Sequence, residues 1–92
     1  MQIVNLSSVE VAISYLGKDG KYEFINLPVD DRPLPMEDKD GEYYLVDKEV
    51  FDKCGLENVV WANPDNIHHD KFGREIGYLC LNGRTRAFTL SF

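Results

Sequence analysis

The chain has 92 residues, a length that allows one domain (residues 1–92) and leaves no room for a second hydrophobic core. Its hydrophobic share of 43% and charged share of 28% exclude a wholly disordered chain. The net charge of -6 argues against nucleic-acid binding, because affinity for phosphates comes from Lys and Arg. We therefore expect a single folded domain with no direct nucleic-acid partner.

The first third of the chain has the alternation of β-strands. Residues 2–6 (QIVNL) form a short apolar run, and residues 9–16 (VEVAISYL) carry apolar side chains at every second position. Residues 17–20 (GKDG) supply a turn, since Gly and Asp tolerate positive φ. Residues 21–27 (KYEFINL) then return with Tyr22 and Phe24 on one side. The pattern predicts one strand followed by a β-hairpin.

A long acidic connection follows the hairpin. Residues 28–41 hold three prolines and no apolar periodicity, and six acidic residues fall between positions 30 and 42. Unstructured connections longer than ~12–15 residues are uncommon in compact domains and are often functional or mobile. The simpler interpretation is a solvated tether, and we expect one here.

The middle of the chain predicts a strand, a short helix and a second strand. Residues 42–46 (EYYLV) are apolar and rich in tyrosine, which favours a strand. In the next segment Asp47 suits a helix N-cap and Gly55 a helix end, with Val50, Phe51 and Cys54 on one face. Residues 58–62 (NVVWA) have strand propensity that Pro64 brings to an end.

The last part of the chain predicts a β-hairpin. Residues 75–81 and 84–92 flank Asn82-Gly83, a pair that suits a two-residue type I′ turn. That register places Gly77 opposite Phe88, so that the aromatic ring can cover bare backbone. We therefore expect Gly77 to have a structural role.

Together these elements predict an α+β fold. It would be a small, mainly antiparallel β-sheet curled against one short helix, with a C-terminal Asn-Gly hairpin. Cys54 and Cys80 lie in apolar patterns without metal or redox spacing, which indicates small buried side chains and a reducing compartment. The chain shows neither a leader-like start nor an apolar run near ~18 residues. We expect a cytoplasmic protein without membrane contact, in the host cytoplasm if the protein is viral.

His68, His69 and Asp70 are the candidates for metal or acid–base chemistry. Adjacent histidines on an extended chain point to opposite sides, and no third ligand has suitable spacing. We therefore expect exposed loop histidines, no metal and no cofactor. A serine nucleophile elbow and a glycine-rich phosphate loop are also missing from the sequence, which favours a non-enzymatic protein.

The segment HDKFGREIG predicts a tight turn that leads into a strand. Asp70 can accept backbone N–H groups across the turn, and Gly73 can supply a positive φ. Arg74 would then either be held by Asp70 or point outward to bind an anionic ligand. The other candidate ligand-binding residues are Arg84, Arg86 and, by stacking, Trp61.

Four stretches, IVNLSSVEV, YYLVDKEV, NVVWANP and HDKFGREIG, resemble a diffuse group of small phage and prophage proteins of unassigned function. That group opens with N-L-[ST]-P-H and closes with R-D-x-x-G-R-x-x-G. Here Ser8 replaces the proline, Val9 the histidine, and His69 the first arginine. A role that depends on the opening histidine therefore does not transfer. The resemblance implies a viral accessory gene.

Three functions follow from these observations. The leading hypothesis is a non-enzymatic phage or prophage accessory protein that binds and sequesters or inhibits a host component, such as a defence system. The first alternative is a sponge for an anionic small molecule such as a signalling nucleotide. The second is a minor virion or assembly protein that acts as a homo-oligomer through the edge of residues 84–92.

Overall fold

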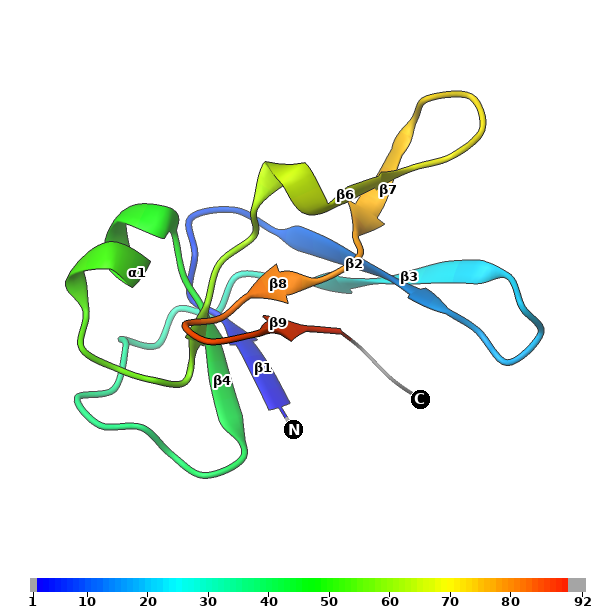
Figure 1. Cartoon of the computed structure of the whole chain (residues 1–92). Helices are drawn as coiled ribbons and strands as arrows, with labels where there is room; N and C mark the ends of the chain where they lie inside the picture. Colours follow the sequence, from blue (N-terminus) through cyan, green and yellow to red (C-terminus); the bar gives the residue numbers. More distant parts are fainter. Residues whose placement is uncertain (1, 90–92) are drawn as a thin grey trace.

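The structure is a computed structural model that describes residues 2–89. Its elements in chain order are β1 (Gln2–Asn5), β2 (Val11–Leu16), β3 (Tyr22–Leu27), β4 (Glu42–Leu45), α1 (Lys48–Lys53), β5 (Val59–Val60), the 3-10 turn η1 (Pro64–Asn66), β6 (Ile67–His69), β7 (Glu75–Tyr78), β8 (Leu81–Asn82) and β9 (Ala87–Phe88). In Figure 1 the β2–β3 and β6–β7 hairpins extend away from the end of the molecule that carries α1.

The predicted α+β class is confirmed, with one short helix and three sheets in the described residues. The β2–β3 and β8–β9 pairs are antiparallel, as the two predicted hairpins require, and the β6–β7 pair, which was not predicted, is antiparallel as well. The sheet β1-β4-β5 is instead parallel, and β2 also meets β7 in a parallel bridge. Parallel pairing arises because α1 carries the chain from β4 back to the start of β5, and parallel neighbours need such a crossover.

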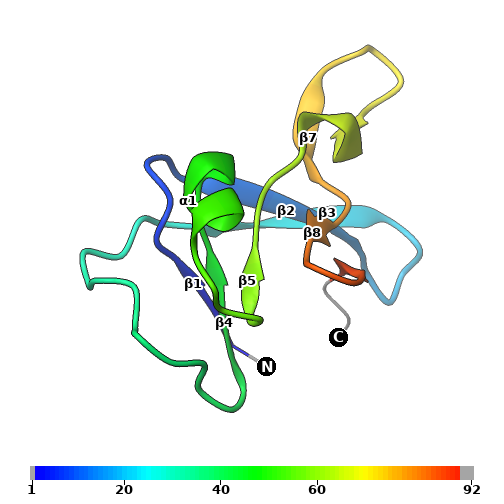
Figure 2. The same ribbon diagram turned by 60° about the vertical axis from the view of Figure 1, so that its left-hand side comes forward.

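Two hydrophobic clusters hold the sheets together. The first joins α1 to the parallel sheet and contains Val4, Tyr44, Val46, Phe51, Leu56 and Val59. Figure 2 shows α1 lying against β1, β4 and β5. The second cluster joins the parallel sheet to β2 and β8 and contains Val11, Ile13, Leu45, Val60 and Leu81. The β4 and β5 strands supply side chains to both clusters, as strands buried on both faces must.

Asn5 connects the end of β1 to the second sheet. Its side chain is 2% exposed, and its Nδ2 donates to the carbonyls of Val9 (2.9 Å) and Leu27 (2.8 Å). Its Oδ1 accepts from the backbone N–H of Ser7 at 3.0 Å, and the Ser7 hydroxyl lies 2.6 Å from the same oxygen. Both donors and the acceptor of one buried amide are therefore used.

The acidic connection is anchored to the fold at several points. Leu34 packs against the first cluster, and the backbone of Val29 bridges Asn5. The Asp38 carboxylate accepts the backbone N–H groups of Glu57 (3.0 Å) and Asn58 (2.8 Å). The predicted tether is thus a mostly exposed loop that is fixed to the first cluster by Leu34 and to the residues just before β5 by Asp38.

The helix lies where the sequence predicts, but the expected side-chain bond at its N-cap is missing. It begins at Lys48 and ends at Lys53, and the Asp47 side chain makes no capping hydrogen bond to it. That carboxylate instead accepts from the backbone N–H (3.2 Å) and the hydroxyl (3.1 Å) of Ser8.

Cys54 and Cys80 are free and only partly buried, not fully buried as expected. Over residues 2–89, no helix has the length and apolar character that crossing a bilayer requires.

The predicted two-residue turn at Asn82-Gly83 is wrong. Asn82 pairs with Ala87, so the loop spans residues 83–86 and is closed by the Gly83 N–H donating to the Arg86 carbonyl at 2.8 Å. The cause lies outside the hairpin, since Asn82 also exchanges two 2.9 Å backbone bonds with Trp61. This tertiary pairing overrides the local turn preference of Asn-Gly.

The predicted register between Gly77 and Phe88 is also wrong. Residues 75–81 do not form one strand, because β7 joins the four-stranded sheet while β8 pairs with β9. Phe88 lies opposite Leu81, and its ring covers Gly83, where an added Cβ would meet the ring edge. An aromatic ring therefore does cover a glycine, but the glycine is Gly83.

Gly77 keeps a structural role for a different reason. It has a φ of +136°, and a Cβ there would lie 3.0 Å from the Ala12 carbonyl oxygen and 3.1 Å from the Ser14 nitrogen. The backbones of β7 and β2 can approach this closely only where a side chain is missing. Gly77 also pairs with His68 of β6, so it sits where the two hairpins meet.

Candidate functional site

The four-stranded sheet, in the order β3-β2-β7-β6, is covered on one face over β2, whereas β3 is exposed along almost its whole length. On the covered face, Val11 and Ile13 of β2 are buried in the second cluster. On the other face, cross-strand pairing places Leu16 opposite Tyr22 and Ser14 opposite Phe24. We call this second face, made of Ala12, Ser14, Leu16, Tyr22, Phe24 and Asn26, the open face.

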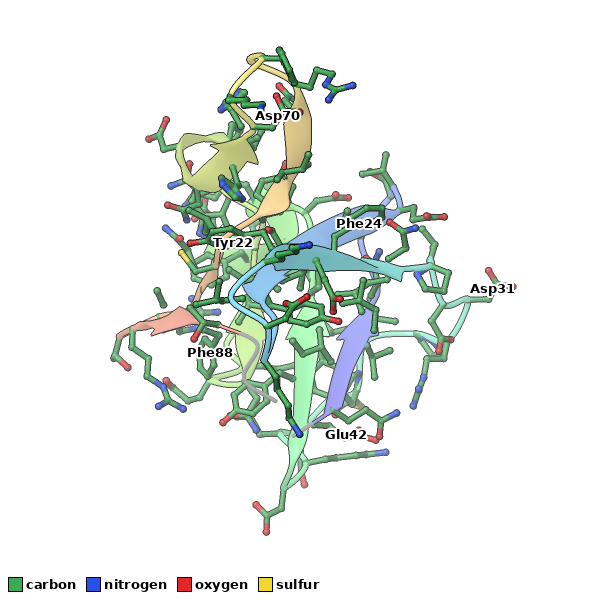
Figure 3. The ribbon with its side chains drawn as sticks, turned by 90° about the vertical axis from the view of Figure 1, so that its right-hand side faces the viewer. Tyr22, Phe24, Asp31, Glu42, Asp70 and Phe88 are labelled. Atoms are coloured by element: carbon green, nitrogen blue, oxygen red, sulfur yellow. The ribbon has the colours of Figure 1, made fainter. Side chains whose placement is uncertain are left out.

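The open face exposes large apolar side chains. Leu16 is 60% exposed, Tyr22 53% and Phe24 59%. Figure 3 shows Tyr22 and Phe24 along β3, below the β6–β7 loop that Asp70 marks. Because β3 is the last strand of its sheet, nothing in residues 2–89 pairs with its outer edge. No proline interrupts residues 22–27, so this edge lacks a common guard against pairing with another chain.

A groove of about 360 Å³ adjoins the open face at Phe24. Val9 and Ile67 contribute further apolar lining, and β7 forms part of the groove from Glu75 to Tyr78. Two carboxylates, Glu10 and Glu75, belong to the same lining. We call this feature the acidic groove.

His68 links the two hairpins. Its Nδ1 lies 3.1 Å from the Ser14 hydroxyl, and its ring meets the Tyr22 ring edge-on with centroids 4.4 Å apart. The predicted exposed loop position is wrong for His68, which lies half-buried on β6. Ser14 is only 2% exposed, so the Ser14–His68 pair joins strands and does not present a nucleophile to solvent.

His69 is exposed, and its Nε2 lies 4.0 Å from a carboxylate oxygen of Glu75. His69 and His68 pair with different β7 residues across a bulge. In the part of the chain that the structure describes, no three His, Cys, Asp or Glu side chains gather closely enough to hold a metal ion.

The turn after β6 has the geometry that the sequence predicts. Asp70 Oδ1 accepts the backbone N–H groups of Phe72 (2.8 Å) and Arg74 (3.0 Å), and Gly73 has a φ of +80°. Arg74 Nε also donates to Asp70 Oδ2 at 2.8 Å. Both Arg74 and Asp70 thus serve the turn, although the Arg74 side chain stays 73% exposed.

The bonds of the turn change the acidity of Asp70. The Arg74 backbone N–H, followed by the Phe72 N–H and the Arg74 guanidinium, holds the pKa of the Asp70 carboxyl below its ordinary value. A carboxyl with a lowered pKa in the folded state stabilises the protein above its unfolded-state pKa. That contribution is lost as the pH falls through the folded-state value.

Arg84 does not point to an open ligand site. Its Nε donates to the Leu56 carbonyl (2.6 Å), and its Nη2 donates to the carbonyls of Cys54 (2.7 Å) and Phe51 (3.1 Å). These carbonyls belong to the end of α1 and the residues just after it, where backbone acceptors lack helical partners. The Arg84 guanidinium also lies 4.6 Å from the centre of the Phe51 ring. Arg84 therefore caps the helix.

The four candidate ligand-binding residues do not share a site. Arg86 lies over the Phe88 ring at 4.4 Å, on the exposed β8–β9 loop. Trp61 packs against the first cluster beneath Lys48, whose Nζ is 4.7 Å from its ring centre. Arg74 lies on the β6–β7 loop, which projects from another part of the molecule (Figure 1). Arg74 therefore shares no site with the other three candidates, while Arg84 and Trp61 both contact the Phe51 ring and Arg84 is used by the end of α1.

Replacing Arg84 by alanine tests the capping role. We expect Arg84→Ala to lower the free energy of unfolding by about 2 kcal/mol, because three carbonyls lose a charged donor. Arg86→Ala is the matched control and should change it by less than about 0.5 kcal/mol, since Arg86 is exposed. Urea unfolding followed by circular dichroism measures both. Equal effects of the two variants would contradict the capping role.

The open face was not predicted from the sequence as a site. Its signal was present in β3, where Tyr22 and Phe24 alternate with the apolar residues Ile25 and Leu27 of the opposite face. A strand that is apolar on both faces is either buried on both or binds something on one.

Comparisons of the chain with protein families, curated proteins and solved structures find no match.

Proposed function

We propose that the protein is a non-enzymatic binding protein that holds a partner protein against its open face. The observation that carries this proposal is the group of three neighbouring apolar side chains, Leu16, Tyr22 and Phe24, each more than half exposed. Single exposed apolar residues are ordinary, whereas a contiguous patch on a small domain marks an interaction surface. Aromatic side chains are also enriched at protein interfaces.

The edge of β3 supports a protein partner over a small molecule. A strand of another chain can add to an unpaired edge by backbone hydrogen bonds, while side-chain pockets supply specificity. The open face reaches this edge and also meets the acidic groove at Phe24. A partner could therefore use the backbone of β3 and the adjoining surface together.

The role of a phage or prophage accessory protein that inhibits a host component agrees with this arrangement. It rests on the resemblance of the chain to small phage proteins and on the exposed binding face. The alternative of an anionic small-molecule sponge has less support, because Arg84 caps α1 and Arg74 pairs with Asp70. The alternative of a virion or assembly protein would use the same face with a viral partner.

The test compares two double variants. Leu16→Ser/Phe24→Ser removes apolar side chains from the open face. Met36→Ser/Val50→Ser instead removes one exposed apolar side chain from the acidic connection and one from α1. The immobilised wild-type protein and both variants are incubated with lysate of infected and uninfected host cells, and the retained proteins are quantified by mass spectrometry. We expect the partner to be retained by the wild type and by the Met36→Ser/Val50→Ser variant and lost from the open-face variant.

The identity of the retained protein separates the alternatives. A host protein supports the accessory role, and a particle protein supports the assembly role. Equal retention by both double variants would contradict binding through the open face. Thermal unfolding of each variant serves as the folding control, because all four substituted side chains are at least 39% exposed and should contribute little to stability.

A further inference from the structure

The acidic groove contains two carboxylates without a strong cationic partner. Glu10 is exposed, and its side chain makes no ion pair or hydrogen bond within residues 2–89. The Glu75 side chain is 68% exposed, and its one ion-pair partner within 4.0 Å in the described residues is His69, which is charged only when protonated. No lysine or arginine belongs to the described lining of the groove.

The Lys and Arg ion pairs of the described residues do not involve Glu10 or Glu75. The arginines and lysines that form ion pairs are Arg32 with Asp30 and Glu42, Lys48 with Asp52, Lys53 with Glu49, and Arg74 with Asp70. Within the described residues no Lys or Arg therefore forms an ion pair with Glu10 or Glu75, so both carboxylates can bind a cation that another molecule presents.

The rest of the lining is apolar. Val9, Phe24 and Ile67 provide aliphatic and aromatic surface beside the two carboxylates. This combination suits a long side chain with an apolar stem and a positive end, since such side chains pack their methylenes on apolar surface and keep the charge at the rim. An arginine or lysine side chain has this chemistry, and the exposed Phe24 ring offers a cation–π contact in addition.

We propose that the acidic groove receives an arginine or lysine side chain from a short extended segment of the partner protein. The inference rests on the proposed function and names the chemistry that the partner presents. Arginine is the better occupant, because its planar guanidinium can form a bidentate pair with a carboxylate and can also stack on an aromatic ring. The volume of about 360 Å³ lies near the lower end of the ~300–1,000 Å³ range of ligand pockets, which suits one side chain with its flanking backbone.

The experiment is a titration of the ¹⁵N-labelled protein with three peptides, followed by two-dimensional NMR. The peptides are acetyl-VRVRV-amide, the same peptide with citrulline in place of arginine, and acetyl-VEVEV-amide. Citrulline keeps the shape of arginine without its charge. We expect saturable shifts of the Ala12, Phe24 and Gly77 amides with the arginine peptide, at least fivefold weaker affinity for the citrulline peptide, and no shifts with the glutamate peptide.

Variants that remove carboxylates test whether Glu10 and Glu75 bind the arginine peptide. Glu10→Gln/Glu75→Gln should weaken binding of the arginine peptide about fivefold, since exposed ion pairs contribute modestly. The matched control, Glu37→Gln/Asp40→Asn, removes two negative charges from the acidic connection and should leave binding of the arginine peptide unchanged. Added salt should also weaken binding of the arginine peptide more than that of the citrulline peptide.

Two outcomes would overturn the inference. One is no saturable shift with the arginine peptide. The other is equal affinity for the citrulline peptide or for the Glu10→Gln/Glu75→Gln variant. If that variant also retains the partner in the lysate experiment while Leu16→Ser/Phe24→Ser loses it, the open face binds its partner without charge recognition. The proposed function would then stand while the present inference fails.

Discussion

Replacing Asn5 by aspartate is expected to lower the free energy of unfolding by about 3–5 kcal/mol at pH 7, close to the effect of leaving a buried charge unpaired. The carboxylate cannot donate to the carbonyls of Val9 and Leu27, which now receive both amide hydrogens of Asn5. It would also place a negative charge beside those two oxygens at a site that is 2% exposed. Urea unfolding followed by circular dichroism measures the loss.

Asn26→Asp is the matched control for this substitution. Asn26 lies on the exposed strand β3, and the same chemical change there should alter stability by less than about 0.5 kcal/mol. The pH dependence separates the two variants further. Burial raises the pKa of the carboxyl introduced at position 5 in the folded state, so the Asn5→Asp variant should recover stability as the pH falls and the group is protonated. A loss no larger than that of Asn26→Asp would contradict the role of Asn5.

Replacing Gly77 by alanine is the second substitution with a large expected effect, about 3 kcal/mol. Alanine is strained at a φ of +136°, and its Cβ would press on the Ala12 carbonyl oxygen and the Ser14 nitrogen. The β6–β7 hairpin should therefore separate from β2. Hydrogen exchange of the His68 and Tyr78 amides should accelerate more than that of Val60, which measures local opening against global unfolding.

Gly55→Ala is the control for Gly77→Ala, because no atom within 4 Å opposes a Cβ at Gly55 and its φ is not positive. It should leave stability nearly unchanged. The comparison also bears on function, since Gly77 and Glu75 belong to the lining of the acidic groove. Unchanged hydrogen exchange of the His68 and Tyr78 amides in Gly77→Ala would contradict the claim that β7 can approach β2 only where a side chain is missing.

Local sequence patterns were sufficient to predict most of the elements. The strands around Ile13, Phe24 and Tyr44 and the helix at Phe51 lie where alternation, turn residues and helix-end residues indicate. The Asp70 turn was predictable for the same reason, because its carboxylate bonds within four residues. Information of this kind is contained in short stretches of sequence.

Long-range partners were not predictable in this way. The Asn-Gly turn failed because Trp61 competes for the backbone of Asn82, a pairing that no local pattern reveals. Arg84 resembled a free surface cation, yet its acceptors are carbonyl groups 28 to 33 residues earlier. The candidate site had the same difficulty, since the acidic groove joins Glu10 and Phe24 to Glu75 only after the sheet has formed.

The position of Arg84 has a consequence for how the domain is made. A helix of six residues is too short to persist alone in water, and its terminal carbonyls acquire their donor from a residue 30 positions after Cys54. On the ribosome, α1 therefore cannot acquire this cap when it emerges and has to wait until Arg84 has been synthesised. Completion of α1 is coupled to formation of the β8–β9 loop, which carries Arg84.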